Sequence, residues 1–250
     1  MNASTTSALR EYLLAFADDE HLMGQQHTEW IGVAPFLEED LAFSSIGQDE
    51  LGHAVLLYEL VCGLDGVEPT DAAIDELAYG RAGEDYRSSA FTEYVTTDWA
   101  EALVRHWIYD MIEARRWEFV AGSTHGPLAS VAVRAEREEV YHRRHAQALM
   151  DSLLATAARS ELEQALETVL TLLPSLFAPV AGEQVLVSAQ VVAGSLGSIA
   201  PLISKTIGEA FDTPIDLAVG EDGRTERSEY FAPLMKRMRE VLDLDPEAVW

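Results

Sequence analysis

Two segments of this chain carry a glutamate followed three residues later by a histidine. Glu50 and His53 form the first pair, and Glu139 and His142 form the second. Both pairs lie in stretches with helical periodicity, where residues three apart share one face of the helix. Each pair can therefore present one carboxylate and one imidazole to a single metal ion.

Two further carboxylates are expected opposite these pairs, because facing residues of an antiparallel helical hairpin lie equally far from the turn. Reflecting the first glutamate through a turn near residue 35 gives Glu20, and reflecting the second through a turn near residue 125 gives Asp110 or Met111. Each position is roughly 15 residues, or about 22 Å, from its turn. Four carboxylates and two histidines from four helices are the ligand set of a di-iron carboxylate centre. The predicted metal ligands are Glu20, Glu50, His53, Asp110, Glu139 and His142.

Other interpretations of these six residues stay open. Acidic residues make up 43 of the 250 positions, so a Glu-x-x-His motif also arises by chance. The six could form a metal-free polar core in a non-catalytic scaffold. A ferritin-type iron store is disfavoured, because the chain is much longer than a four-helix bundle requires. Mixed imidazole and carboxylate ligation with open positions suits iron and O₂ chemistry, so di-iron is the hypothesised cofactor.

The positioning elements are predicted to be helices, since no convincing strand alternation or βαβ rhythm is present. The order is a helical hairpin, a long crossover with one short helix, a second hairpin and further helices. It predicts an all-α fold, a ferritin-like four-helix bundle with one long crossover and extra C-terminal helices. Residues 1–250 are predicted to form one domain, with the core bundle at about 4–158 and additional helices at about 160–243. The four bundle helices are expected at about 4–30, 35–62, 90–121 and 128–158.

The charge and composition exclude several classes of partner. The net charge is −26, with 17 basic residues, so nucleic acid and anionic membrane surfaces would be repelled. No apolar run is long enough to span a bilayer, and the N-terminus lacks a signal-peptide pattern. Cys62 is the single cysteine, which suits a reducing, cytoplasmic location. An acidic chain whose lysines are Lys205 and Lys236 alone also suggests a halophilic protein, adapted to high salt.

Three sequence blocks resemble one known family. They are Glu29–Pro35, with the pattern Glu-Trp-x-Gly-x-Ala-Pro, then Ile46–Ala54, then Arg137–His142. They resemble the phenylacetyl-CoA epoxidase subunits PaaA and PaaC of phenylacetate catabolism. The length and the C-terminal segment Thr225–Trp250 resemble PaaC.

The resemblance implies a ferritin-like subunit of a multicomponent oxygenase that epoxidises phenylacetyl-CoA with O₂. In that family PaaA is the catalytic di-iron component, and PaaC docks with PaaA and often lacks metal ligands. The implied role is therefore a supporting C-type subunit, whose own catalytic activity is left open. The implied partners are a PaaA-like subunit, other oxygenase-complex subunits, a reductase and an aromatic acyl-CoA. The PaaA ligand pattern falls on the same six residues, so a C-type subunit either keeps its metal here or retains these residues as a polar core.

Overall fold

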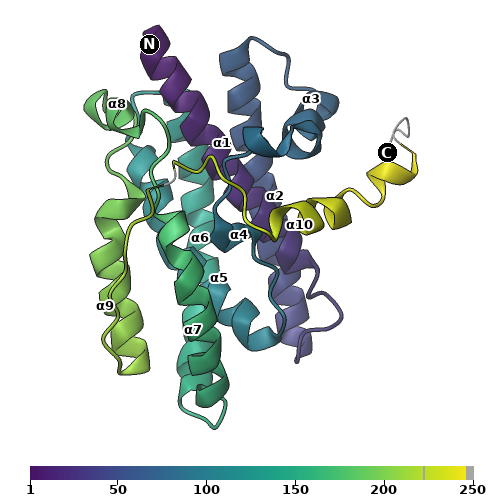
Figure 1. The fold of residues 1–250 in the computed structure, drawn as a ribbon, viewed down its shortest axis with the longest axis vertical. Coiled ribbons are helices and arrows are strands. Elements are labelled where there is room, and N and C mark those ends of the chain that lie inside the picture. Colours follow the sequence, from purple (N-terminus) through teal and green to yellow (C-terminus); the bar gives the residue numbers. More distant parts are fainter. Residues whose placement is uncertain (222, 246–250) are drawn as a thin grey trace.

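The computed structural model describes residues 1–221 and 223–245, and their regular structure is helical, without β-strands. Four long helices form the bundle (Figure 1): α1 (Ala3–Thr28), α2 (Leu37–Asp65), α5 (Trp99–Ala121) and α6 (Gly126–Leu154). α1 packs along α2, α5 packs along α6, and α2 packs against α6. The chain crosses from α2 to α5 through residues 66–98. This arrangement confirms the ferritin-like all-α fold with one long crossover.

The crossover contains more structure than the sequence predicts. It holds α3 (Asp71–Asp75), a π-helical turn (Glu76–Gly80), a 3₁₀ turn (Gly83–Asp85) and α4 (Ala90–Glu93). The single helix predicted at 90–121 is wrong in part, because α4 ends at Glu93 and α5 begins at Trp99. The Asp98 side chain accepts a hydrogen bond from the Glu101 backbone N–H at 2.9 Å and caps α5.

The second helix also ends later than predicted. Gly63 continues the helix, and α2 stops at Asp65 because Gly66 adopts the left-handed conformation, with φ of 70°. At the other hairpin, α6 begins with Pro127 in its first turn and ends at Leu154, four residues before the predicted end.

The extra C-terminal helices are present. They are α7 (Arg159–Leu176), α8 (Glu183–Ser188), α9 (Ala200–Phe211) and α10 (Phe231–Met238), with 3₁₀ turns at Leu196–Ile199 and Leu242–Leu244. α7 and α9 pack against α5 and α6, and α8 packs against α1. Residues 246–250, the end of the segment that resembles PaaC, lie outside the described residues. Among the helices that the structure describes, none is long and apolar enough to cross a membrane.

α1 and α2 pack closely against each other at two glycines. A Cβ atom placed on Gly24 would lie 3.0 Å from the Gly47 carbonyl oxygen, and one placed on Gly47 would lie 2.9 Å from the Gly24 carbonyl oxygen. Only glycine fits such an approach without movement of a backbone. Gly24 lies one turn after Glu20 and Gly47 lies one turn before Glu50, so this contact sets the distance between the two predicted ligands.

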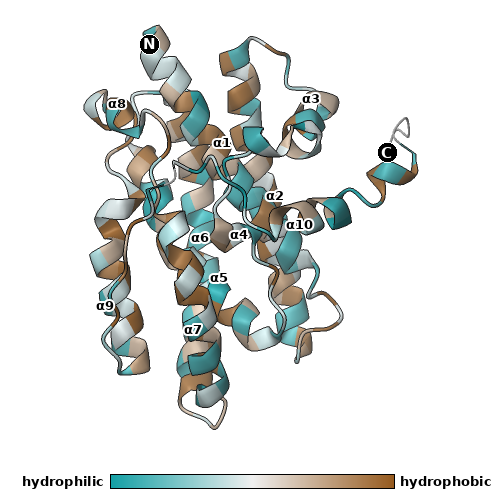
Figure 2. Cartoon of the chain, viewed as in Figure 1, coloured by the Kyte–Doolittle hydropathy of each residue, from teal (hydrophilic) through white to brown (hydrophobic). Residues whose placement is uncertain are grey.

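α1 contains both hydrophilic and hydrophobic residues (Figure 2), and several of its polar side chains are buried in the bundle. Asp19 is fully buried between Arg116 of α5 and Arg224, at 2.8 Å and 2.5 Å. Burial would raise the pKa of Asp19, but the two guanidinium groups outweigh it and lower the pKa. Arg224 also donates to the carbonyls of Leu176 and Ala178. This Asp19 network (Asp19, Arg116, Arg224) ties the C-terminal segment to α1 and α5.

Candidate metal centre

All six predicted ligands are buried in the centre of the bundle, and each is at most 1% exposed. α1 supplies Glu20, α2 supplies Glu50 and His53, α5 supplies Asp110, and α6 supplies Glu139 and His142. The structure brings their side chains together as one cluster. His53 Nδ1 lies 3.2 Å from Glu20 Oε2 and 3.9 Å from Glu139 Oε1. His142 Nδ1 lies 3.1 Å from the same Glu139 oxygen.

A seventh side chain, Glu113, joins the cluster and connects its parts. Glu113 Oε1 lies 3.6 Å from His53 Nδ1. One set of ligand atoms within 4.8 Å of one another comes from Glu20, His53 and Glu113, and a second comes from Glu50, Asp110 and Glu113. Glu113 was not among the residues predicted from the sequence. Its position three residues after Asp110, on the same face of α5, was the available signal.

The cluster contains more carboxyl groups than groups that can carry a positive charge. Burial, followed by the Glu113 charge, raises the pKa of Glu20 and Glu50 far above the usual value, and raises the pKa of Glu139 to about 8. Burial would raise the pKa of Glu113 as well, but its interactions with His53 and Glu20 outweigh it and lower the pKa to about 2. Five carboxyl groups in one dry space need either protons or cations.

Many donor atoms of the cluster lack a hydrogen-bond partner within the described part of the chain. They are Glu50 Oε1, Glu113 Oε2, His142 Nδ1 and both carboxylate oxygens of Asp110 and Glu139. Buried polar atoms are rarely left without a partner. Oxygen and imidazole donors facing one space are the ligand types that bind iron and similar ions. The residues therefore fit a di-iron group.

Two carboxylates outside the cluster hold its histidines in a crosswise arrangement. Glu138 Oε2 of α6 lies 2.7 Å from His53 Nε2 of α2, and Asp49 Oδ2 of α2 lies 3.2 Å from His142 Nε2 of α6. Each histidine thus faces the cluster through Nδ1 and an outer carboxylate through Nε2. An imidazole whose second nitrogen donates to a carboxylate is the usual form of a metal-ligating histidine.

Hydrogen bonds or short polar contacts also hold three carboxylates of the cluster. The Tyr109 hydroxyl donates to Glu20 Oε1 at 2.6 Å, and His27 Nδ1 lies 2.5 Å from Glu50 Oε2. Trp117 Nε1 donates to Glu113 at 2.9 Å, and the Trp117 ring packs against His53 with centroids 5.2 Å apart. The positions of the donor atoms are therefore fixed by neighbours on α1 and α5.

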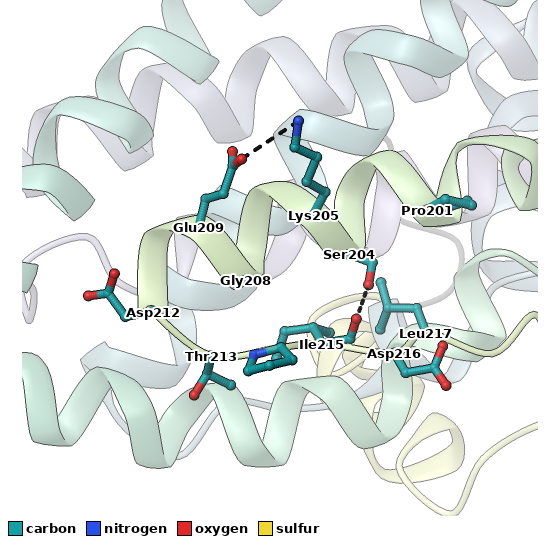
Figure 3. Close-up of a pocket in the computed structure, with 11 residues that line it drawn as sticks. Pro201, Ser204, Lys205, Gly208, Glu209, Asp212, Thr213, Ile215, Asp216 and Leu217 are labelled. Atoms are coloured by element: carbon teal, nitrogen blue, oxygen red, sulfur yellow. Dashed lines mark hydrogen bonds and ion pairs between the residues drawn. The ribbon is translucent and has the colours of Figure 1, made fainter.

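A surface pocket of about 660 Å³ lies elsewhere, between α9 and the segment that follows it. Figure 3 shows Lys205 and Glu209 turned toward each other on α9, 3.7 Å apart, and Ser204 bonded to the Ile215 carbonyl. The one lysine that lines this pocket pairs with a neighbouring glutamate on the same helix, so the buried cluster is the stronger site for chemistry.

This chain is similar in sequence to known proteins. A family model described as phenylacetic acid catabolic protein, PaaA_PaaC, matches residues 1–250. The chain is 28% identical over 145 residues to the C subunit of the 1,2-phenylacetyl-CoA epoxidase of Escherichia coli (strain K12), covering 58% of this chain and 57% of that protein. It is 25% identical over 135 residues to the A subunit of the same enzyme, covering 54% of this chain and 41% of that protein. These matches thus span about half the length of each curated relative. With the family model matching from end to end, this chain belongs to the phenylacetic acid catabolic protein family, PaaA_PaaC.

Proposed function

We propose that this chain is a C-type subunit of an aerobic phenylacetyl-CoA epoxidase in phenylacetate catabolism, and that it holds a di-iron group of its own while supporting an A-type catalytic subunit. The observation that carries the metal part is the buried cluster of five carboxylates and two histidines with unpartnered donor atoms. The C-type role is supported by the identity to the Escherichia coli C subunit, which is greater than the identity to its A-type counterpart.

In this proposal seven side chains hold the metal ions. Glu113 would be one of these ligands, because it belongs to both sets of converging ligand atoms. The remaining six are the residues predicted from the sequence: Glu20, Glu50, His53, Asp110, Glu139 and His142. Bound iron supplies the redox chemistry that activates O₂.

The surrounding side chains of this chain have two tasks. Asp49 and Glu138 accept from the Nε2 atoms of His142 and His53 and keep each Nδ1 directed inward. Trp117, which is fully buried, covers one side of His53 and excludes water from it. A dry, fixed set of donors strengthens the electrostatic binding of cations.

The contact with the A-type subunit is proposed at the connection between α1 and α2. Five large apolar side chains within 11 residues are between 47% and 68% exposed there, namely Ile31, Val33, Phe36, Leu37 and Leu41. A contiguous exposed apolar patch marks an interaction surface. The other proposed partners, a reductase, further oxygenase subunits and an aromatic acyl-CoA, bind the assembled complex.

The docking surface is tested by Leu41→Asp in a co-purification experiment with an A-type subunit. The charge would be buried on association, so we expect the complex to be lost while the helix content of the chain is kept. Leu202→Asp, on the exposed side of α9 and 44% exposed in the native chain, is the matched control and should co-purify normally. Equal recovery of both variants would reject this surface.

The metal assignment is tested by iron analysis after anaerobic reconstitution of the purified chain. We expect about two iron ions per chain, the content of a di-iron carboxylate centre, and a large loss in Glu139→Ala and in Glu113→Ala. Iron content equal in wild type and both variants would refute it. Turnover of phenylacetyl-CoA by the complex with Glu139→Ala then separates a catalytic from a supporting role, since unchanged turnover assigns this chain the supporting one.

A metal-free scaffold is the second candidate function. It is favoured by the ion pairs that His53 and His142 make with surrounding carboxylates, which outweigh burial and raise the pKa of both imidazoles. In that case the cluster is a polar core that specifies helix register. The same iron analysis decides between the two functions, because a scaffold takes up no iron that depends on Glu139.

A further inference from the structure

Most basic residues of this acidic chain form internal ion pairs. The sequence holds 17 basic residues against 43 acidic ones. Both members of an adjacent arginine pair on α5 have a carboxylate partner: Arg115 pairs with Glu118 at 2.6 Å, and Arg116 pairs with Asp19 at 2.8 Å. The basic residues without an ion pair in the described part of the chain are Arg105, Arg137, Arg143, Arg144 and Lys236.

Two of these exceptions, Arg143 and Arg144, are adjacent on α6. No hydrogen bond or ion pair among the described residues uses either guanidinium group, and Arg143 Nε is buried without a partner. Arg105, by contrast, donates to Gln26 Oε1 at 3.0 Å and to the Tyr94 carbonyl. Buried donors are rarely left without an acceptor. The described residues therefore leave two neighbouring positive groups on α6 without the anion that usually accompanies them.

Both arginines line one surface pocket of about 390 Å³ between α5 and α6. The other residues that line it are Trp107, Met111, Val140 and Gln147. Among these described lining residues none is acidic, and none belongs to the carboxylate cluster. Gln147 accepts from Trp107 Nε1 at 2.9 Å and donates to Asp151 at 2.7 Å, so its amide is engaged on both sides. The two guanidinium groups are therefore the charged groups that this pocket offers to a ligand.

We propose that this pocket binds a small molecule through a phosphate group, with Arg143 and Arg144 as the anion-binding residues. A guanidinium group donates two parallel hydrogen bonds to phosphate oxygens. A phosphate group carries a charge of about −1.5 to −2 at pH 7, which matches two guanidinium groups, whereas a single carboxylate would neutralise only one.

The size and walls of the pocket suit a ligand larger than the phosphate itself. Sites for small molecules usually have volumes of about 300–1,000 Å³ and combine apolar walls with a few polar groups. Met111 and Val140 supply apolar wall here, one from each helix. The site needs no metal ion, so it stands apart from the di-iron group in the proposed function.

The overall charge of the chain favours a small ligand over an acidic protein. The net charge of −26 repels an approaching anion, and the repulsion grows with the number of charges that approach. Charges more than about 10 Å apart are largely screened at 0.1 M salt. One phosphate group is therefore governed mainly by the arginines that it contacts, whereas an acidic protein surface would bring many carboxylates close to this acidic chain.

The test is calorimetric titration of adenosine diphosphate (ADP) into the full-length chain freed of metal, where no bound ion offers the phosphate another ligand. We expect Arg143→Gln to weaken binding about 10–100-fold, the usual loss for a charged hydrogen bond. Arg144→Gln should weaken it less, because that side chain is exposed. Arg137→Gln is the matched control, since it removes an unpaired arginine of the same helix from outside the pocket, and it should bind as wild type does.

Two results of this titration would overturn the proposal. They are equal affinity of Arg143→Gln and Arg137→Gln for ADP, and no measurable binding of ADP by wild type. Arg143→Lys keeps the charge but not the paired hydrogen bonds of a guanidinium group, so its affinity should lie between those of wild type and Arg143→Gln. Circular dichroism establishes that each variant keeps its helix content.

Further titrations identify what carries the phosphate. Tighter binding of ADP than of inorganic phosphate would support an organic ligand that also contacts Met111 and Val140, and equal affinities would support free phosphate as the ligand of the same site. Adenosine that binds as tightly as ADP would overturn the role of the phosphate group. A glutamate-rich peptide that binds through Arg143, when neither phosphate compound does, would assign the pocket to an acidic protein and reject the proposal.

Discussion

Replacing Glu138 with glutamine tests whether the crosswise carboxylates control metal binding. Glutamine keeps the length of the side chain but removes the charge that faces His53 Nε2 at 2.7 Å. Loss of an outer carboxylate that orients a metal-ligating histidine typically weakens affinity 10–100-fold, or about 1.4–2.8 kcal/mol. The Glu138 side chain is 26% exposed and also forms an ion pair with Arg134 at 3.3 Å. Solvent and the arginine therefore screen its charge. We therefore expect the lower end, about tenfold.

The assay is calorimetric titration of manganese(II) or, anaerobically, iron(II) into the metal-free chain. Asp49→Asn should weaken binding less than Glu138→Gln does, because Asp49 lies 3.2 Å from its histidine and is 31% exposed. Glu136→Gln, two residues before Glu138 on α6 and outside the cluster, is the control for lost charge. If Glu138→Gln binds metal as tightly as Glu136→Gln does, the anchoring role deduced from the geometry is wrong.

Three further predictions concern stability. Gly47→Ala should lower the free energy of unfolding in urea by about 1–3 kcal/mol, because the new methyl group would meet a carbonyl oxygen at 2.9 Å. Gly52→Ala is the control and should be neutral or stabilising, because nothing lies within 4 Å of the new methyl group. Equal effects of the two substitutions would contradict the close helix contact. Asp19→Asn removes the charge of the buried carboxylate that two arginines contact and should cost about 3–5 kcal/mol. A loss no larger than that of a surface substitution would contradict the network. The metal-free chain should be less stable at pH 8.5 than at pH 6, because burial raises the pKa of Glu139 in the folded chain to about 8. The contribution of this group to stability is complete below its unfolded pKa and is lost as the pH rises through 8, whereas the lowered pKa of Glu113 affects stability only in acid. Bound manganese(II) should remove this difference, and equal stability of the metal-free chain at both pH values would refute the prediction.

The sequence was sufficient to locate most of the cluster because two regular features determine it. The three-residue repeat of helix faces pairs each glutamate with its histidine, and hairpin symmetry indicates the facing positions Glu20 and Asp110. Hairpin symmetry predicts only one facing position on each partner helix. It could therefore not show that Glu113, one turn further along α5, also faces inward.

Some features that the sequence prediction missed were local, and others depended on contacts between distant segments. The break between α4 and α5 follows from local capping by Asp98, a signal that was present but was hidden by the apolar periodicity around it. The Gly24–Gly47 contact requires the register of α1 on α2, which the periodicity alone does not give.

The Asp19 network has a consequence for how the protein is made. Asp19 and Arg224 are separated by 205 residues, so at synthesis rates of about 5–20 residues per second the aspartate waits about 10 to 40 s for its second arginine. During that interval the nascent bundle holds a carboxylate that is only partly neutralised, next in sequence to Glu20 of the carboxylate cluster. Chains released early would carry this defect permanently, which gives the cell's proteases a physical means of distinguishing them from finished molecules.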